Sequence, residues 1–343
     1  MIKKIEIENF MQLKNQKLDF SNINIFAGVN DTGKTSLLKL LYASVKAREE
    51  DKNRVSIDNF EEHFSKKLRD VFDIEKLGNL VTKKEKTLKV ELFFENKSNH
   101  LFSFFSEAEK KFQICSSLDN HNFKTQSTFL PPKEVLTIVN LIRTTREIHD
   151  YKGYDDSYYD VVKSLFIPLS RGDLSEGFKK VDKELETSFN GKIIQKENNF
   201  IFQKDGHEFS MPLTAEGVKK IGMINQLLKN KTINENTILI IDEPEISLHP
   251  SMIEKVAKAL FDLSKVGVQI FIATHNYFIL KSFQLLALEH HENISFFNLE
   301  KQNNEIKVTT SNLKDGMPKN EIVDSSISLF NREAHIKIKK MGI

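Results

Sequence analysis

The most telling segment of this chain is Gly28-Val29-Asn30-Asp31-Thr32-Gly33-Lys34-Thr35. It fits the pattern G-x-x-x-x-G-K-[S/T] of a P-loop, a turn that binds the phosphates of a nucleotide. The two glycines let the backbone curl so that successive N–H groups point at phosphate oxygens, and the helix that follows adds its partial positive charge. The segment therefore predicts a nucleoside triphosphate as the ligand.

The residues on either side predict a strand before this segment and a helix after it. Residues 23–26 are mostly apolar, and leucines recur from Leu37 to Leu41 at helical spacing. In that setting Lys34 is expected to contact the β- and γ-phosphates, and Thr35 to offer its hydroxyl to Mg²⁺. The predicted ATP-binding residues are Gly28, Asn30, Asp31, Thr32, Gly33, Lys34, Thr35 and Ser36.

A second feature is the apolar run 238–241, which is followed directly by Asp242 and Glu243. A continuous apolar run is typical of a strand buried in a parallel sheet, whose carboxyl end faces the ligand crevice. We expect Asp242 to support Mg²⁺, and Glu243 to polarise the attacking water as a general base. The alternative, a strand that ends in solvated acids, is weakened by the P-loop upstream.

Another buried strand is predicted at 268–273, and His275 lies just beyond its end. A histidine at that edge of the sheet can donate a hydrogen bond to a γ-phosphate oxygen. Upstream, residues 214–217 open a helix that could bind an anion. From the residues alone, an ordinary helix cap at Thr214 is the favoured interpretation of that start.

The remaining pattern divides the chain into strands and helices. Alternating residues predict strands at 5–7 and 18–20, antiparallel strands at 87–94, 100–105 and 112–115, and hairpin strands at 192–195, 200–203 and 208–211. Helices are expected within 133–190, with Asp173 as a cap for one of them, and at 214–228, 253–263 and 277–288. A strand at 294–299 and a helical tail from 319 complete the pattern.

Composition excludes several classes of protein. The chain has 343 residues and a net charge of +2, which argues against a protein that coats nucleic acid through charge alone. No apolar run approaches a membrane span, and the N-terminus lacks a signal-peptide pattern. The single cysteine, Cys115, is expected to be an inert core thiol. We therefore expect a cytoplasmic protein without a membrane partner.

The order of these motifs resembles the ABC-type ATPase heads, most closely the RecF/SMC-like and OLD-like AAA-family ATPases. The resemblance rests on the P-loop, Leu-Thr-Ala-Glu-Gly at 213–217, Ile-Asp-Glu-Pro-Glu-Ile-Ser-Leu-His-Pro at 241–250 and Ala-Thr-His-Asn at 273–276, and covers about residues 1–46 and 190–330. It implies an α/β P-loop NTPase head with a mostly parallel core sheet, an antiparallel β lobe that takes the strands within 87–130, and a helical insertion. The expected division is a discontinuous ATPase domain, 1–132 and 191–343, around an insertion at 133–190.

The resemblance also assigns roles. It implies that Lys34, Glu243 and His275 are catalytic and that Thr35 and Asp242 hold Mg²⁺. Ser247, Leu248 and His249 would match the D-loop, and Thr214, Ala215, Glu216 and Gly217 the signature motif. Because the signature of one subunit caps the ATP of another in these families, the implied unit is a head-to-tail homodimer or a higher homo-oligomer.

Some residues depart from the family pattern. Thr214 and Glu216 stand where serine and glycine are commoner, and Asp31 stands at a P-loop position that is often glycine. Either departure is expected to slow hydrolysis or to weaken engagement in trans. For the Q-loop glutamine the candidates are Gln113 and Gln126, and an ordinary surface glutamine is the default for both.

Two absences narrow the expectation further. The insertion is too short for an SMC coiled coil, and the stretch after His275 is too short for a Toprim nuclease domain, so we expect no nuclease activity in this chain. OLD-like heads often belong to bacterial antiphage systems, which implies a protein effector or nuclease as partner. Three hypotheses stay open: an ATP hydrolase that drives or gates this partner, a nucleotide-gated scaffold with negligible turnover, and a RecF-type repair ATPase that binds DNA.

Overall fold

The central sheet has the strand order β14-β13-β3-β12-β11-β7, in which only the edge strand β14 runs antiparallel to its neighbour. The structure is a computed structural model that describes residues 1–343 except 52–56, 117–122, 150, 170–171, 303–304 and 341–343. The strands of this sheet are β3 Ile23–Ala27, β7 Gln126–Leu130, β11 Thr237–Asp242, β12 Gln269–Thr274, β13 Ile294–Gln302 and β14 Glu305–Asn312.

Both faces of the central sheet are covered at its inner strands, which explains why β3, β11 and β12 are mostly apolar. Alternate side chains such as Leu239 and Ile272 pack with α6, α7 and α8 on one face, whereas Ile240 and Phe271 pack with α1 on the other. The helices are α1 Lys34–Glu50, α2 Ile57–Phe72, α3 Val139–Glu147, α4 Asp156–Leu165, α5 Glu176–Phe189, α6 Glu216–Lys229, α7 Pro250–Lys265, α8 Tyr277–His290 and α9 Glu321–Lys340. Short 3₁₀ turns lie at Leu77–Leu80, Met211–Leu213 and Leu313–Asp315.

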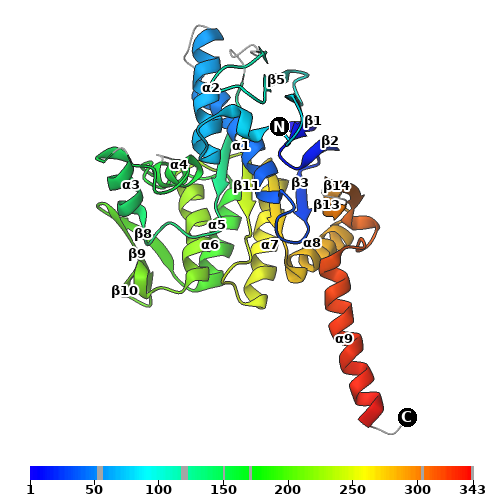
Figure 1. The fold of residues 1–343 in the computed structure, drawn as a ribbon. Coiled ribbons are helices and arrows are strands. Elements are labelled where there is room, and N and C mark those ends of the chain that lie inside the picture. Colours follow the sequence, from blue (N-terminus) through cyan, green and yellow to red (C-terminus); the bar gives the residue numbers. More distant parts are fainter. Residues whose placement is uncertain (52–56, 117–122, 150, 170–171, 303–304, 341–343) are drawn as a thin grey trace.

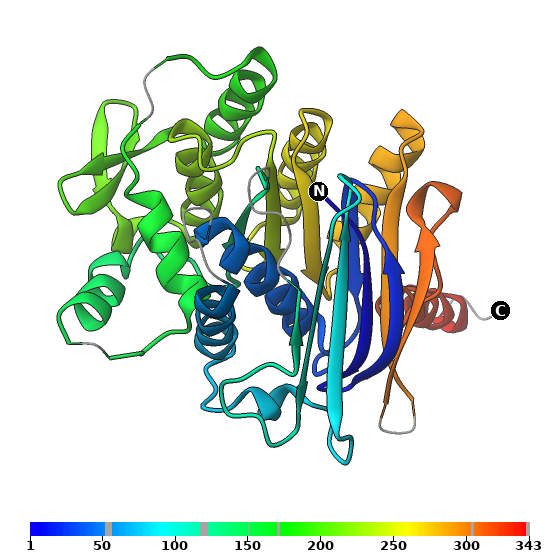
Figure 2. The ribbon, with the colours of Figure 1, turned by 90° about the horizontal axis from the view of Figure 1, so that it is seen from above.

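A second, antiparallel sheet has the order β2-β1-β4-β5-β6 and stands beside the central sheet, as Figure 2 shows. It shares one hydrophobic cluster with α1, α2 and the near face of the central sheet. A third, small sheet has the order β10-β9-β8. The strands are β1 Ile2–Phe10, β2 Leu13–Asp19, β4 Thr87–Phe94, β5 Asn99–Phe105, β6 Ile114–Cys115, β8 Lys192–Lys196, β9 Asn199–Lys204 and β10 His207–Ser210.

The segment 133–190 is helical, with α3, α4 and α5. Its helices share the hydrophobic cluster of α6 and α7, so this segment is packed against the core. The division of the chain into domains remains a prediction. At the other end of the chain, α9 projects away from the body of the molecule (Figure 1).

Four expectations about these elements were wrong. Residues 126–130 do not join the antiparallel lobe, because β7 pairs in parallel with β11 at the edge of the central sheet. The strand β14 was not expected, since most of its side chains are exposed and give no apolar pattern. Thr214 and Asp173 are not helix caps: the cap positions are Ala215 and Ser175, and neither side chain accepts a capping hydrogen bond.

Candidate functional site

The P-loop connects β3 to α1, as the motif predicted, and its two glycines are required by geometry. Gly33 adopts a left-handed conformation, with φ 80°, at the N-cap of α1. At Gly28 an added Cβ would lie 2.3 Å from the main-chain oxygen of Leu299 on β13. Larger residues would therefore be strained at Gly33 and would clash at Gly28.

Lys34 points back into this loop. Its Nζ donates hydrogen bonds to the carbonyl oxygens of Gly28, at 2.8 Å, and Val29, at 2.9 Å. Burial lowers the pKa of Lys34, and the negative charges of Glu243 and Asp242 oppose that shift. The ammonium group is thus held inside the loop, where phosphate oxygens would compete for its protons.

Thr35 and Asp242 meet at the carboxyl edge of the central sheet, although they lie far apart in the sequence. The Thr35 hydroxyl donates to Asp242 Oδ2 at 2.8 Å. The other carboxylate oxygen of Asp242 is buried and has no hydrogen-bond partner among the described residues. A hydroxyl, a carboxylate and a spare buried oxygen fit a hard cation such as Mg²⁺, so these two residues are the ones that would hold it.

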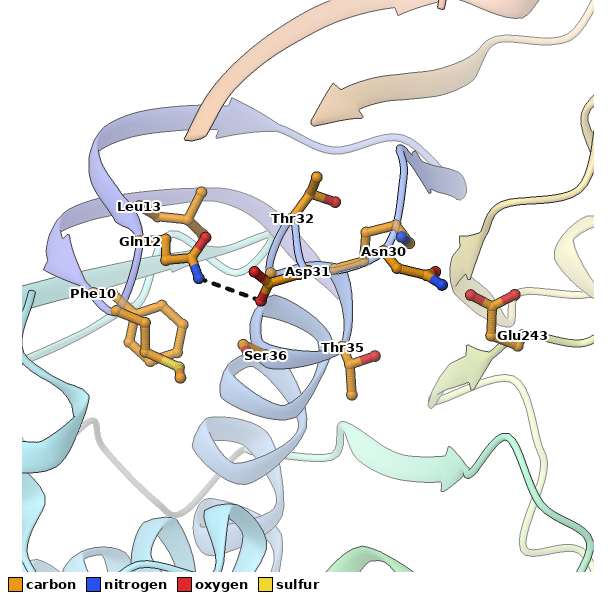
Figure 3. Close-up of a pocket in the computed structure, with 12 residues that line it drawn as sticks. Phe10, Gln12, Leu13, Asn30, Asp31, Thr32, Thr35, Ser36 and Glu243 are labelled. Atoms are coloured by element: carbon orange, nitrogen blue, oxygen red, sulfur yellow. Dashed lines mark hydrogen bonds between the residues drawn. The ribbon is translucent and has the colours of Figure 1, made fainter. Parts of the chain in front are cut away.

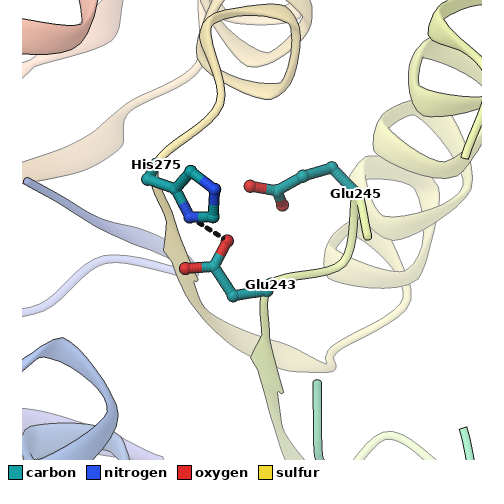
Figure 4. A group of neighbouring side chains, drawn as sticks. All are labelled: Glu243, Glu245 and His275. Atoms are coloured by element: carbon teal, nitrogen blue, oxygen red, sulfur yellow. Dashed lines mark ion pairs between the residues drawn. The ribbon is translucent and has the colours of Figure 1, made fainter. Parts of the chain in front are cut away.

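Glu243 follows β11 and pairs with His275, which follows β12. The distance between Glu243 Oε2 and His275 Nδ1 is 2.6 Å. Figure 4 shows Glu245 beside this pair. Glu245 is buried and accepts a hydrogen bond from the Thr274 hydroxyl. Burial, reinforced by Glu243, raises the pKa of Glu245. The two predicted catalytic side chains, Glu243 and His275, therefore lie together, and Glu245 is a second acid beside them.

A cavity of about 320 Å³ lies over the P-loop, and Figure 3 shows its lining. The predicted residues Asn30, Asp31, Thr32, Gly33, Lys34, Thr35, Ser36 and Glu243 line it. Asn30 extends toward Glu243 in this view. Gly28 is not among the lining residues, but its carbonyl oxygen accepts from Lys34. This cavity has the residues and position expected for the phosphates of a nucleotide.

The turn between β1 and β2 closes one side of the cavity and was not anticipated. The lining residues from that region are Phe10, Met11, Gln12 and Leu13. Gln12 donates a weak 3.4 Å hydrogen bond to Asp31, which also lies 3.6 Å from Lys301. No local pattern marks this turn, because only the pairing of β1 with β2 brings it to the P-loop.

The predicted signature and D-loop residues lie against each other and outside this cavity. An added Cβ at Gly217 would lie 2.7 Å from Leu248 Cδ2, so the first turn of α6 packs directly on the D-loop segment. Thr214 is buried and donates to the Ser210 carbonyl, whereas Ala215 and Glu216 are exposed. Ser247 adopts φ 65°, and His249 caps α7 through the Ser251 amide.

Neither Q-loop candidate reaches the site. Gln126 begins β7 opposite Thr237, at the amino end of the sheet, and accepts a hydrogen bond from Asn234 at 3.3 Å. Gln113 is exposed, and its main-chain N–H donates to the carbonyl oxygen of Ser103 in the antiparallel sheet. The sequence analysis did not identify Lys220, a buried lysine of α6 that donates to the main-chain carbonyl of Glu243. In the sequence it is marked only by its place in a pair of lysines, 219–220, within a largely apolar helix.

Comparison with solved structures places the fold among the ABC-type ATPase heads. An SMC head solved with the C-terminal winged-helix domain of ScpA superposes with a TM-score of 0.56 and 14% identity, covering 92% of this chain and 98% of that one. The SMC head domain of Thermotoga maritima superposes with a TM-score of 0.51 and 12% identity, covering 90% and 98%. These likenesses show the fold.

A profile of the family described as "AAA domain, putative AbiEii toxin, Type IV TA system" matches residues 23–281, more than half of the chain. The chain belongs to this AAA-domain family. Endonuclease GajA of Bacillus cereus is 24% identical over 330 residues, covering 79% of this chain and 55% of that protein. The Old nuclease of Escherichia phage P2 is 51% identical over 41 residues, covering 12% of this chain and 7% of that one.

The expectation of an ABC-type, OLD-like ATPase head is thus confirmed. The chain spans little more than half the length of the longer-matching curated relative. Among the described residues, no helix is long and apolar enough to cross a membrane.

Proposed function

We propose that this chain binds ATP with Mg²⁺ and hydrolyses it in a head-to-tail dimer, and that the cycle drives or gates a protein partner. The observation that supports this most is the meeting of Thr35 with Asp242, at 2.8 Å, beside Glu243 in the cavity over the P-loop. A phosphate cradle, a cation site and a general base are the parts that phosphoryl transfer to water requires.

The proposed reaction uses Glu243 as the base. Its carboxylate takes a proton from water as the water oxygen bonds to the γ-phosphorus, and the bond from that phosphorus to the bridging oxygen breaks to leave ADP and inorganic phosphate. Lys34 and the N-terminus of α1 stabilise the negative charge. Bound Mg²⁺ would supply further positive charge to the phosphate oxygens.

In this scheme His275 can contact either the Glu243 carboxylate or the γ-phosphate of the nucleotide. In the structure it contacts Glu243 at 2.6 Å, so the base is engaged. A γ-phosphate would offer the ring another acceptor and leave the Glu243 carboxylate to a water molecule. We therefore assign His275 the role of a switch between the base and the nucleotide.

Dimerisation and partnership rest on separate observations. The exposed Ala215 and Glu216 lie outside the chain's own cavity, as residues that cap a second subunit's nucleotide would. The matched relatives are called nucleases, and this chain covers only part of each of them. We propose that the head works in the bacterial cytoplasm with an effector or nuclease of an antiphage system.

The test is ATP turnover by the purified chain beside its Glu243→Gln variant, with size-exclusion chromatography of both in ATP and Mg²⁺. We expect the variant to lose turnover by at least about a hundredfold, because the amide cannot accept the proton, and to trap ATP in a dimer. Glu289→Gln, on the exposed side of α8, serves as the matched control. Equal turnover in Glu243→Gln and the control contradicts the assignment of the base.

A nucleotide-gated scaffold is the second candidate, and the close contact of Glu243 with His275 is the observation that favours it. It predicts that the wild-type chain binds ATP without measurable phosphate release. Rapid release by the chain alone would exclude it.

A further inference from the structure

Lys220 lies on the second turn of α6 and is 5% exposed. Its ammonium group donates hydrogen bonds to the main-chain carbonyls of Pro132, at 3.1 Å, and of Glu243. Pro132 follows the end of β7 and Glu243 follows the end of β11. One buried side chain therefore joins the carboxyl ends of two parallel strands to α6.

The main chain of Glu243 needs such support because its backbone is strained. Its φ is 51°, in the left-handed region, which is unfavourable for a residue with a side chain unless its surroundings hold it there. The Glu243 amide donates to the Ala273 carbonyl at 2.9 Å, so β12 holds one side of this residue. Lys220 holds the other side through the Glu243 carbonyl.

The start of α6 touches the same loop a few residues further on. Gly217 packs against this loop: an added Cβ would lie 2.7 Å from Leu248 Cδ2 and 3.3 Å from the Ser247 carbonyl oxygen. The Ile246 amide returns to the Glu243 carbonyl at 3.3 Å. The residues proposed to meet a partner's nucleotide and the loop that carries Glu243 are thus packed together.

The charges around Lys220 suit this position. Burial lowers its pKa to about 8, and the carboxylates of Glu245, Asp242 and Glu243 oppose the shift. A methionine there would fill a similar volume but donate to neither carbonyl, which leaves the Glu243 carbonyl with the 3.3 Å hydrogen bond from the Ile246 amide alone among the described residues.

We propose that Lys220 is a positioning residue that holds the main chain of Glu243 in its working conformation and couples the start of α6 to that base. The inference rests on the proposed hydrolysis. A nucleotide that docks on α6 from a second subunit would then adjust Glu243 through Lys220. Neither the motifs nor the matched relatives assign this lysine a role.

The test compares Lys220→Met with Lys220→Arg and with Lys229→Met, a control at the far end of the same helix where the lysine pairs with Glu186. We expect kcat to fall about a hundredfold in Lys220→Met, the usual effect of misplacing a catalytic group by about 1 Å. KM for ATP, and binding of a non-hydrolysable analogue, should stay within about threefold of wild type. The arginine, which keeps the donors, should recover part of kcat.

A second readout does not depend on turnover. Hydrogen exchange at the Ile246 and Leu248 amides should become at least about tenfold faster in Lys220→Met while β11 stays protected. Unchanged exchange overturns the inference even if the wild-type chain proves inactive, and that inactivity would bear on the proposed function alone. If the wild-type chain hydrolyses ATP, a kcat of Lys220→Met equal to that of the wild type also overturns the inference. Should the methionine variant fail to fold, Lys220→Leu, which also lacks a donor, takes its place in both measurements, and wild-type kcat or exchange in that variant counts against the inference.

Discussion

Among single residues, His100 has the least expected environment. Its ring is fully buried on β5 and packs among Phe60, Phe64 and Phe102, with centroid distances of 5.0–5.7 Å. Neither ring nitrogen has a hydrogen-bond partner within the described part of the chain. Burial, aided by the charge of Arg48, lowers the pKa of His100 well below its ordinary value. The folded protein therefore holds this histidine neutral.

This environment predicts a loss of stability in mild acid. Below the unfolded pKa of about 6.5, the unfolded chain binds a proton that the folded chain does not, so the free energy of unfolding falls with pH. Between pH 7.5 and 5.5 His100 should account for about 1.4 kcal/mol of that fall. Denaturant titrations of wild type and His100→Leu at both pH values measure it. A pH dependence that is the same in both proteins contradicts the prediction.

Some residues of the candidate site belong to short sequence motifs, and others are brought to the site only by the fold. Lys34, Thr35, Asp242 and Glu243 belong to contiguous motifs whose residue types follow from phosphate and metal chemistry, so they could be predicted. Gln12 and Lys220 could not, because each acts through contacts with residues distant in sequence.

Between elements, a buried ionic network joins α1, α2 and α4. Lys67 of α2 is 5% exposed and lies 3.0 Å from Asp160, 3.1 Å from Glu50 and 3.4 Å from Asp156. Burial alone would raise the pKa of Asp160, but Lys67 and Lys163 bring it below its ordinary value. Lys67 thus helps to tie α1 to the helical segment, together with Tyr42 of α1, which donates to Asp160, and Lys39 of α1, which pairs with Asp155.

Removing that lysine should destabilise the fold strongly. Lys67→Met leaves the buried carboxylate of Asp160 without its main counter-charge, and the loss of such a partner typically costs about 3–5 kcal/mol of unfolding free energy. Urea denaturation followed by circular dichroism measures the loss. Lys76→Met, which removes an exposed pair with Glu109, is the control and should show no measurable change. Similar midpoints for the two variants would show that the network contributes little.

Elements with a strong apolar pattern were predicted, and the two edge strands of the central sheet were not. β3, β11 and β12 are buried on both faces and read as continuous apolar runs. β7 contains Gln-Ser-Thr and was assigned to the wrong sheet, since pairing with β11 depends on a partner more than 100 residues away. β14 lies at the edge of the central sheet, where it pairs with β13, and its mostly exposed side chains give no apolar pattern in the sequence.

At the scale of the whole molecule, the proposed head-to-tail dimer gives a prediction of its own. If each site combines the P-loop of one chain with the start of α6 of another, Lys34→Ala inactivates the P-loop side of the site, and Ala215→Glu inactivates the α6 side. Mixing the two variants should restore about a quarter of wild-type turnover. Half of the randomly formed dimers contain one copy of each variant, and one of the two sites in such a dimer has neither substitution.

Phosphate release from the mixture, beside each variant alone, tests this arrangement. A mixture of Lys34→Ala with Asp242→Asn, whose changes fall in the same half, should stay inactive. Recovery in that control, or none in the first mixture, would contradict a head-to-tail site.

The sequence by itself determined that this chain is an α/β protein with a P-loop motif between a strand and a helix, and it predicted which residues would meet the phosphates of a nucleotide. Those features depend on short segments whose residue types and spacing are set by chemistry. The tertiary structure alone decided that β7 extends the central sheet, that the β1–β2 turn closes the cavity, and that Lys220 donates to the main-chain carbonyl of Glu243. Each of these depends on contacts between distant segments, which form only when burial of the two hydrophobic clusters brings the segments together.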